Sequence, residues 1–147
     1  MTRAEMEAIA ERINTGTDNS ETSRALIVFN LTDKPISGVA AFSASMSWLL
    51  GVPLPPVAVT DFDSNPVASA IYDLSLGPDT KGRADRCQLS FNLRFAASDV
   101  PAHGWRTYIA SYTKTAAEQA ELGLGAVELV VIETLRHSGD LPPTGTF

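Results

Sequence analysis

The feature that most constrains this chain is the strict alternation of apolar and polar residues from Cys87 to Phe95. Every second side chain in the run CQLSFNLRF is apolar, and the side chains between them are polar or charged. A strand with one face buried and the other in water shows this period of two. A break at residues 98–104 separates the run from a second β-rich run, Trp105–Tyr112. The two runs predict a central pair of strands, joined through a Pro/Gly loop, in an all-β domain.

Further short strands are predicted around this central pair. Arg24–Asn30 has the compact apolar composition of a buried strand, and Gly38–Ser47 alternates weakly. Val57–Phe62 and Val67–Leu74 flank turn residues and predict a hairpin. One more strand is expected within Ala126–Glu133. Six or more short strands separated by turn signals predict an antiparallel β-sandwich, immunoglobulin-like or related.

We expect the chain to divide into three parts. Thr2–Ile13 predicts a short helix with a capping box and one narrow apolar stripe, which needs a partner surface to be stable. Residues 1–23 are therefore expected to form a lead-in helix and linker from something upstream. Residues 24–113 form the predicted sandwich domain. Residues 114–147 are expected to hold a linker, one further strand and the start of a following β region.

Composition excludes several classes of partner. The 147 residues have a net charge of -6 and no basic run, so neither nucleic acid nor an anionic membrane is an expected partner. No stretch approaches the roughly 20 apolar residues of a membrane helix, and the N-terminus is too charged for a signal peptide. The single cysteine, Cys87, fits a reducing compartment, so a cytoplasmic location is predicted. Its place on the apolar parity predicts a small core residue rather than a nucleophile.

One acidic cluster resembles the opening of a calcium-binding loop. Asp61, Asp63 and Asn65 have the right spacing, but the positions that require glycine and a bidentate glutamate hold Pro66 and Tyr72. The cluster is therefore interpreted as a hairpin turn.

Other short motifs are also better explained as turns or loops. His103 and His137 lie in predicted loops without metal-ligand spacing. The sequon Asn30–Thr32 ends a predicted strand, and the sortase-like pentapeptide Leu141–Gly145 lacks the apolar span that such a signal needs. The sequence thus identifies no catalytic, cofactor-binding or metal-binding residue.

Three aromatic residues are the candidate contacts with carbohydrate or with another domain. They are Trp48, Trp105 and Tyr108, whose rings could stack on the apolar face of a sugar, although core packing is the commoner use of tryptophan. The loop Trp48–Pro56 is apolar yet contains three prolines and a glycine, so it cannot be an ordinary strand interior. We expect this loop to contact another domain rather than to cover the end of the core.

The order of several motifs resembles the region that follows the catalytic and helical domains in glycoside hydrolase family 38 α-mannosidases. The family's VFN-type strand is similar to Leu26–Asn30, which departs from it at Leu31–Asp33. Its V-x-D-x-x-G-x-P-V hairpin resembles Val59–Val67. Its V-P-x-x-G-Y-x-x-Y segment resembles Val100–Tyr108, in which Trp105 replaces the usual tyrosine.

The end of the chain carries a further likeness. Ile132 and Glu133, followed by Pro143–Phe147, are similar to the family's IEN…PxTGT opening of the next β-domain, although the asparagine after Glu133 is missing. The motifs together cover most of the chain in the right order. The resemblance implies a non-catalytic β-sandwich that braces a larger enzyme, with its adjacent domains as partners.

The same resemblance implies where the chemistry of such a parent enzyme resides. The family's zinc site and aspartate nucleophile belong to an upstream α/β domain, and no segment of this chain resembles that domain. We therefore expect no cofactor in this chain and no activity from it alone. The parent reaction would be the retaining hydrolysis of α-mannosides. The ending at TGTF also fits a fragment cut at a domain boundary.

Two alternative hypotheses remain at this point. The chain could be a free-standing carbohydrate-binding or protein-interaction module, which requires an exposed platform built from Trp48, Trp105 or Tyr108. It could also be a small enzyme that uses Asp61, Asp63 and Asp73, although nothing near them in the sequence supplies an acid/base partner.

Overall fold

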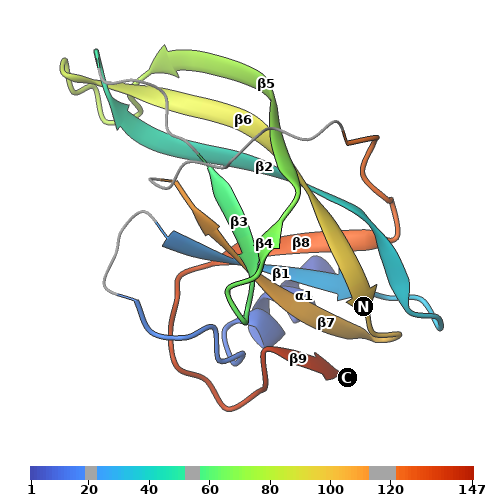
Figure 1. Cartoon of the computed structure of the whole chain (residues 1–147). Helices are drawn as coiled ribbons and strands as arrows, with labels where there is room; N and C mark the ends of the chain where they lie inside the picture. The colour runs from blue at the N-terminus through green and yellow to red at the C-terminus, as the bar shows by residue number, and fades with distance from the viewer. Residues whose placement is uncertain (19–22, 52–56, 113–121) are drawn as a thin grey trace.

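The computed structural model describes residues 1–18, 23–51, 57–112 and 122–147. In this part of the chain two antiparallel sheets pack face to face (Figure 1). The first sheet contains, in spatial order, β4 (Pro66–Val67), β3 (Ala58–Asp61), β7 (Gly104–Ser111), β1 (Ser23–Asn30) and β8 (Leu129–Thr134), and β9 (Thr144–Thr146) also pairs with β7. The second sheet contains β2 (Ile36–Leu49), β6 (Arg86–Val100) and β5 (Ser69–Pro78). The predicted all-β antiparallel sandwich with a short N-terminal helix is confirmed.

Strand β6 explains the alternation that dominates the sequence. From Cys87 to Ala97 its odd-numbered side chains, among them Phe91 and Phe95, are buried, and the even-numbered side chains are more exposed. Cys87 is a buried free thiol on the inward parity, so its predicted core role is confirmed. The alternation therefore arises because one face of β6 packs in the core and the other face is exposed to water.

Strand β1 is buried on both faces, which explains its continuous apolar run. Leu26 and Val28 belong to the core between the sheets. Ala25, Ile27 and Phe29 belong to a second apolar cluster, on the outer face of the first sheet, which the helix covers. Because neither face of β1 is exposed to water, the strand needs no polar residues at alternate positions. Its central position therefore explains the absence of alternation.

The helix α1 (Arg3–Ala10) closes the second cluster. The Thr2 hydroxyl accepts a hydrogen bond from the Glu5 backbone N–H at 3.1 Å, so the expected N-cap is present. Met6 and Ala10 are buried against the first sheet. No helix in the described residues is long and apolar enough to cross a membrane.

The prediction that the two arms around residues 98–104 form a central pair is wrong. Strand β6 continues to Val100, and the chain then crosses into the other sheet before β7 begins. Both edges of β6 are occupied, by β2 and β5, while β7 pairs with β1 along one edge. The alternation specifies a buried face but not a neighbour, because any strand edge offers the same backbone donors and acceptors.

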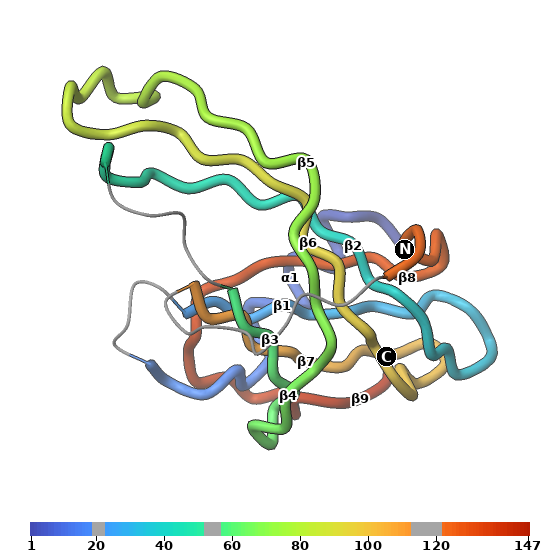
Figure 2. Tube along the Cα trace, turned by 45° about the horizontal axis from the view of Figure 1, so that its top comes forward, coloured from blue at the N-terminus to red at the C-terminus, as the bar shows by residue number. Residues whose placement is uncertain are grey.

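The predicted hairpin around residues 63–66 is only half correct. Strands β3 and β4 do pair, with Val59 opposite Val67. The second arm does not continue as one strand, because β4 ends at Val67 and β5 starts at Ser69 in the other sheet. Figure 2 shows this chain path, which runs from β4 into β5 without a long connection. A bend of one residue leaves too little local signal to be recognised from composition.

The end of the chain folds back onto the first sheet. Strand β9 pairs with β7, and Leu141 forms a parallel bridge with Ile13. A Cβ at Gly104 would overlap the carbonyl oxygen of Gly145, so this pairing requires a glycine at residue 104. The predicted final strand is confirmed but begins later, at Leu129, and the predicted boundary at residues 113 and 114 lies outside the described residues.

Candidate functional site

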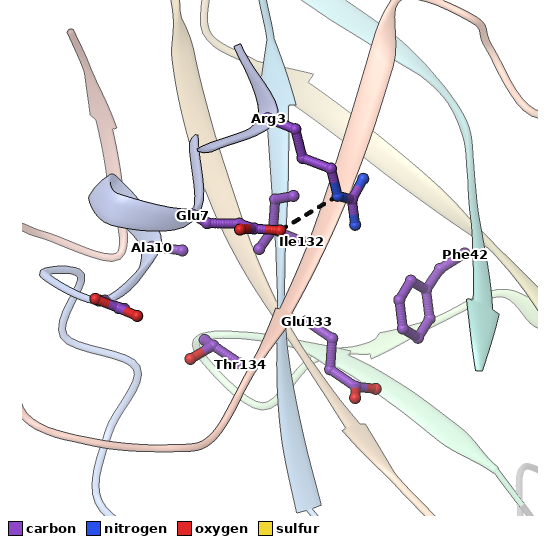
Figure 3. Close-up of a pocket in the computed structure, with 8 residues that line it drawn as sticks. Arg3, Glu7, Ala10, Phe42, Ile132, Glu133 and Thr134 are labelled. Carbon is purple, nitrogen blue, oxygen red and sulfur yellow. Dashed lines mark ion pairs between the residues drawn. The ribbon is translucent and has the colours of Figure 1, made fainter. Parts of the chain in front are cut away.

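Helix α1 and strand β8 border a pocket of about 340 Å³ (Figure 3). Its lining combines carboxylates with apolar groups: Arg3, Glu7, Ala10, Glu11, Phe42, Ile132, Glu133 and Thr134. The ion pair between Arg3 Nε and Glu7 Oε1, at 3.3 Å, lies at its edge, and both side chains are more than half exposed. An exposed pair of this kind contributes little to stability. The pocket is acidic, and its chemistry depends on how its carboxyls ionise.

The Glu133 carboxyl is the one with a perturbed environment. The Tyr112 hydroxyl donates a hydrogen bond to Glu133 Oε2 at 3.2 Å. Desolvation raises the pKa of Glu133, and the Tyr112 hydrogen bond and the Arg24 charge only partly oppose it. Burial and the nearby Glu133 charge raise the pKa of Tyr112 as well, so Tyr112 remains a hydrogen-bond donor at neutral pH. Tyr112 therefore holds the Glu133 carboxyl in place.

The Glu133→Gln variant is expected to gain stability relative to the parent as pH rises. The pKa of the Glu133 carboxyl is higher in the folded state, so its protonated form stabilises the fold. This stabilisation is fully present below the unfolded pKa and is lost as pH rises through the folded pKa. Urea unfolding of both proteins at about pH 4 and about pH 7 measures the effect. The difference should favour the variant more at the higher pH, and a difference that shrinks with pH would contradict it. Glu128→Gln, on an exposed residue, is the matched control.

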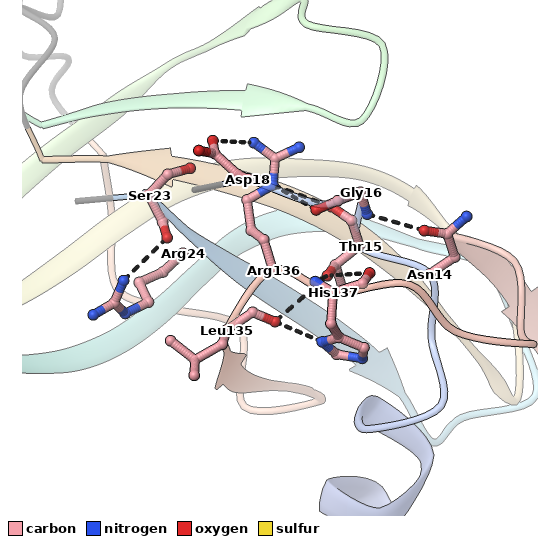
Figure 4. A network of polar contacts seen from close by, with 9 residues as sticks. All are labelled: Asn14, Thr15, Gly16, Asp18, Ser23, Arg24, Leu135, Arg136 and His137. Carbon is pink, nitrogen blue, oxygen red and sulfur yellow. Dashed lines mark hydrogen bonds and ion pairs between the residues drawn. The ribbon is translucent and has the colours of Figure 1, made fainter. Parts of the chain in front are cut away.

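A polar network joins the segment after α1 to the segment after β8 (Figure 4). Arg136 Nε donates to the carbonyls of Thr15 and Gly16, at 3.2 and 3.1 Å, and Arg136 Nη1 pairs with Asp18 Oδ2 at 2.8 Å. The His137 backbone N–H donates to the Thr15 hydroxyl at 2.8 Å. These contacts hold two segments together that are more than a hundred residues apart in sequence.

A second pocket, of about 300 Å³, lies beside this network, and we call it the hydroxyl pocket. It is lined by Asp18, Ser23, Ala58, Thr60, Asp61, Phe62, Ser64, Ile109, Ser111 and Arg136. No pattern along the sequence indicated it, because its residues come from the N-terminal linker, three strands, one turn and the segment after β8.

The structure separates the three aromatic residues that were predicted as contacts. Trp105 and Tyr108 are only 2% and 1% exposed, and they belong to different apolar clusters on opposite faces of the first sheet. Neither ring presents a face to a ligand. Trp48 is partly buried near the end of β2, on the core side. Residues 52–56 of the predicted contact loop lie outside the described residues.

The aspartates of the small-enzyme hypothesis are not brought together. Asp61 Oδ1 accepts hydrogen bonds from the backbone N–H groups of Asp63 and Asn65, both at 2.9 Å. Desolvation opposes ionisation of Asp61, but these bonds, those of the Asn65 side chain and the Arg106 charge outweigh it and lower its pKa. Asp73 lies in β5 of the other sheet, where Oδ2 accepts from Asn92 at 2.8 Å. Asp61 therefore closes a turn, as the hairpin interpretation predicted.

The remaining sequence motifs have structural explanations. Asn30 of the sequon is fully buried at the end of β1, where its amide bonds to backbone groups, so it is a strand-end turn residue as predicted. His137 Nε2 is buried without a hydrogen-bond partner in the described residues. In the same part of the chain no group of three or more His, Cys, Asp or Glu residues could hold a metal ion.

Three comparisons show which known proteins resemble this chain. No family model matches the sequence, and no curated protein matches it. Among solved structures, a protein of glycosyl hydrolase family 38 from Enterococcus faecalis matches with a TM-score of 0.56 and 15% identity, over 80% of this chain and 16% of that chain. An alpha-mannosidase from Enterococcus faecalis V583 matches with a TM-score of 0.55 and 18% identity, over 80% of this chain and 15% of that one.

The match covers most of this chain but only a small part of each neighbour. The chain thus corresponds to less than a fifth of the length of the enzymes it resembles. At these identities the likeness establishes the fold rather than the activity. The resemblance predicted from the motifs is confirmed at that level: this chain has the fold of a β-sandwich segment found within family 38 glycosyl hydrolase structures.

Proposed function

We propose that the chain is a non-catalytic β-sandwich segment of an α-mannosidase-like glycoside hydrolase. In such a parent it would brace the catalytic domain and a following β-domain while the parent hydrolyses α-mannosides. The observation that carries the proposal is the fold match, which spans 80% of this chain but only 15–16% of two family 38 structures. The order of the sequence motifs also supports this proposal, because it resembles the region that follows the catalytic and helical domains of the parent family.

The shape of the second sheet supports a bracing role. One end of β2, β5 and β6 extends past the first sheet in both views of the chain (Figures 1 and 2). Leucines that are 42–61% exposed lie on this extension: Leu49, Leu50, Leu74 and Leu76. Apolar side chains grouped on one projecting end are typical of a contact with another domain. The extension includes Trp48 and leads into the predicted contact loop.

The site chemistry supports an inert chain. The parent family implies zinc, but the described residues offer no group that could ligate it, so we derive no step through zinc in this chain. The sugar-platform alternative requires exposed aromatic rings, and Trp105 and Tyr108 are buried. The buried free thiol of Cys87 and the absence of a basic run support a cytoplasmic chain without nucleic-acid or membrane partners.

Two measurements test this proposal. The coding sequence on either side of the segment should encode an upstream α/β domain with Asp and His metal ligands and a downstream β-domain. A start codon at Met1 and a stop codon after Phe147 would contradict the parent enzyme. The purified chain should not hydrolyse 4-nitrophenyl α-D-mannopyranoside with or without added zinc. Hydrolysis that a chelator abolishes would contradict the non-catalytic role.

A further inference from the structure

We propose that the hydroxyl pocket binds one neutral hexose unit. The pocket lies on the outer face of the first sheet, where its lining residue Ile109 also packs against the second apolar cluster. The inference is independent of the bracing role, because it concerns a site that the isolated chain already contains.

Three of the hydroxyl groups that line this pocket lie on neighbouring strands. Ser23 on β1 and Ser111 on β7 are directly opposite each other, and Thr60 lies on β3 at the other edge of β7. Among the residues that the structure describes, these three hydroxyls have no hydrogen bond to protein. Ala58 and Ile109 lie between them. These lining residues therefore offer uncommitted hydroxyl donors and acceptors around a small apolar patch, as the hydroxyl groups and the ring of a sugar require.

Two residues that line the pocket carry opposite charges and are held in a fixed arrangement. The Asp18 and Arg136 side chains are 28% and 22% exposed and pair at 2.8 Å. Arg136 is also fixed by the carbonyls of Thr15 and Gly16 (Figure 4). A neutral ligand with vicinal hydroxyls can donate to the carboxylate and accept from the guanidinium without breaking the pair. A simple anion or cation would have to compete with one partner for the other.

An aromatic side chain in the lining and the size of the pocket restrict the ligand further. Phe62, 37% exposed, also lines the pocket and offers a ring for the C–H face of a pyranose. A volume of about 300 Å³ is at the small end of ligand pockets, which suits a single ring rather than an oligosaccharide. The other carboxylate in the lining, Asp61, is already bonded to the backbone of its own turn, so a neutral ring with several hydroxyls and one apolar face, such as a hexose, suits this pocket.

The test is a titration of the full 147-residue chain, followed by amide NMR, with three probes: methyl α-D-mannopyranoside, methyl α-D-glucopyranoside and methyl β-D-galactopyranoside. At ordinary ligand efficiency a hexose should bind with a dissociation constant on the order of 1 mM. At least one probe should shift the amides of Ser23, Thr60 and Ser111 saturably. The Thr60→Val variant, which keeps the shape and removes the hydroxyl, should bind about tenfold more weakly. Thr134→Val, on β8 outside the pocket, is the matched control and should bind as the parent does.

Three outcomes would overturn the proposal. The first is no saturable shift with any probe up to about 50 mM, well above the expected dissociation constant. The second is binding that Thr60→Val and Ser111→Ala leave unchanged, which would locate the sugar elsewhere. The third is that sodium phosphate or acetate shifts the same amides while the sugars do not, which would make the pocket an anion site. None of these outcomes bears on the bracing role, which the flanking sequence and the activity assay decide.

Discussion

The Asn30→Ala variant is expected to lose about 3 kcal/mol of unfolding free energy, because its buried amide connects three backbone segments. Nδ2 donates to the carbonyls of Lys34 and Val100, at 2.7 and 3.1 Å. Oδ1 accepts from the backbone N–H and the hydroxyl of Thr32, at 2.9 and 2.7 Å. Asn30 and Val100 are fully buried, so alanine would leave an unsatisfied carbonyl in the interior. The end of β1, the following turn and the end of β6 would lose their common contact.

Urea unfolding of the purified chain measures this loss. Asn92→Ala is the matched control, because Asn92 also makes two side-chain hydrogen bonds, to Ser43 and Asp73, but on an exposed sheet face. The control should cost less than about 1 kcal/mol, since water replaces its lost partners. If both variants lose equal stability, the buried amide does not have the structural role assigned to it.

The Trp105→Ala variant is expected to lose about 3–5 kcal/mol, as large buried aromatic residues do. The ring packs beside Phe29 and Phe147, with centroid separations of 6.5 and 6.1 Å. Its Nε1 donates to the carbonyl of Pro142 at 2.9 Å, so it also fixes the segment that leads into β9. Truncation would leave a cavity under that segment and free the end of the chain from the first sheet.

Thermal unfolding and near-ultraviolet circular dichroism test this expectation. Trp48→Ala is the control, because Trp48 is only partly buried and should cost less. Trp105→Phe separates the contributions, since it keeps an aromatic ring and loses only the hydrogen bond and part of the contact area. A fully stable Trp105→Ala protein that had lost binding to a glycan would instead restore the exposed-platform hypothesis.

The local features of this chain could be read from its sequence. Each depends on residues within a few positions of one another. The alternation from Cys87 to Phe95 predicted a strand with one buried face, and Thr2 predicted the start of the helix. The turn residues around Asp63 predicted the β3–β4 connection. The two-sided burial of β1 was indicated by its unbroken apolar run.

The candidate sites were less predictable, because they combine residues from distant segments. The hydroxyl pocket joins Asp18 to Arg136 across more than a hundred residues, and three of its hydroxyl groups come from separate strands. Conversely, the sequence allowed Trp105 to form a surface platform, but in the structure its ring packs in the second apolar cluster and against Phe147. The sequence offers no signal for either outcome, since a tryptophan suits a core and a binding surface equally well.

By itself, the sequence determined most of the strands, which of their faces are apolar and the turn around Asp63. Only the tertiary structure decided that β6 and β7 belong to different sheets, that the chain switches sheets between Val67 and Ser69, and that β9 joins β7. The physical reason is that side-chain periodicity reports local burial, whereas backbone hydrogen-bonding groups are the same on every strand edge. The choice of neighbour is made by the packing of the two apolar clusters as a whole.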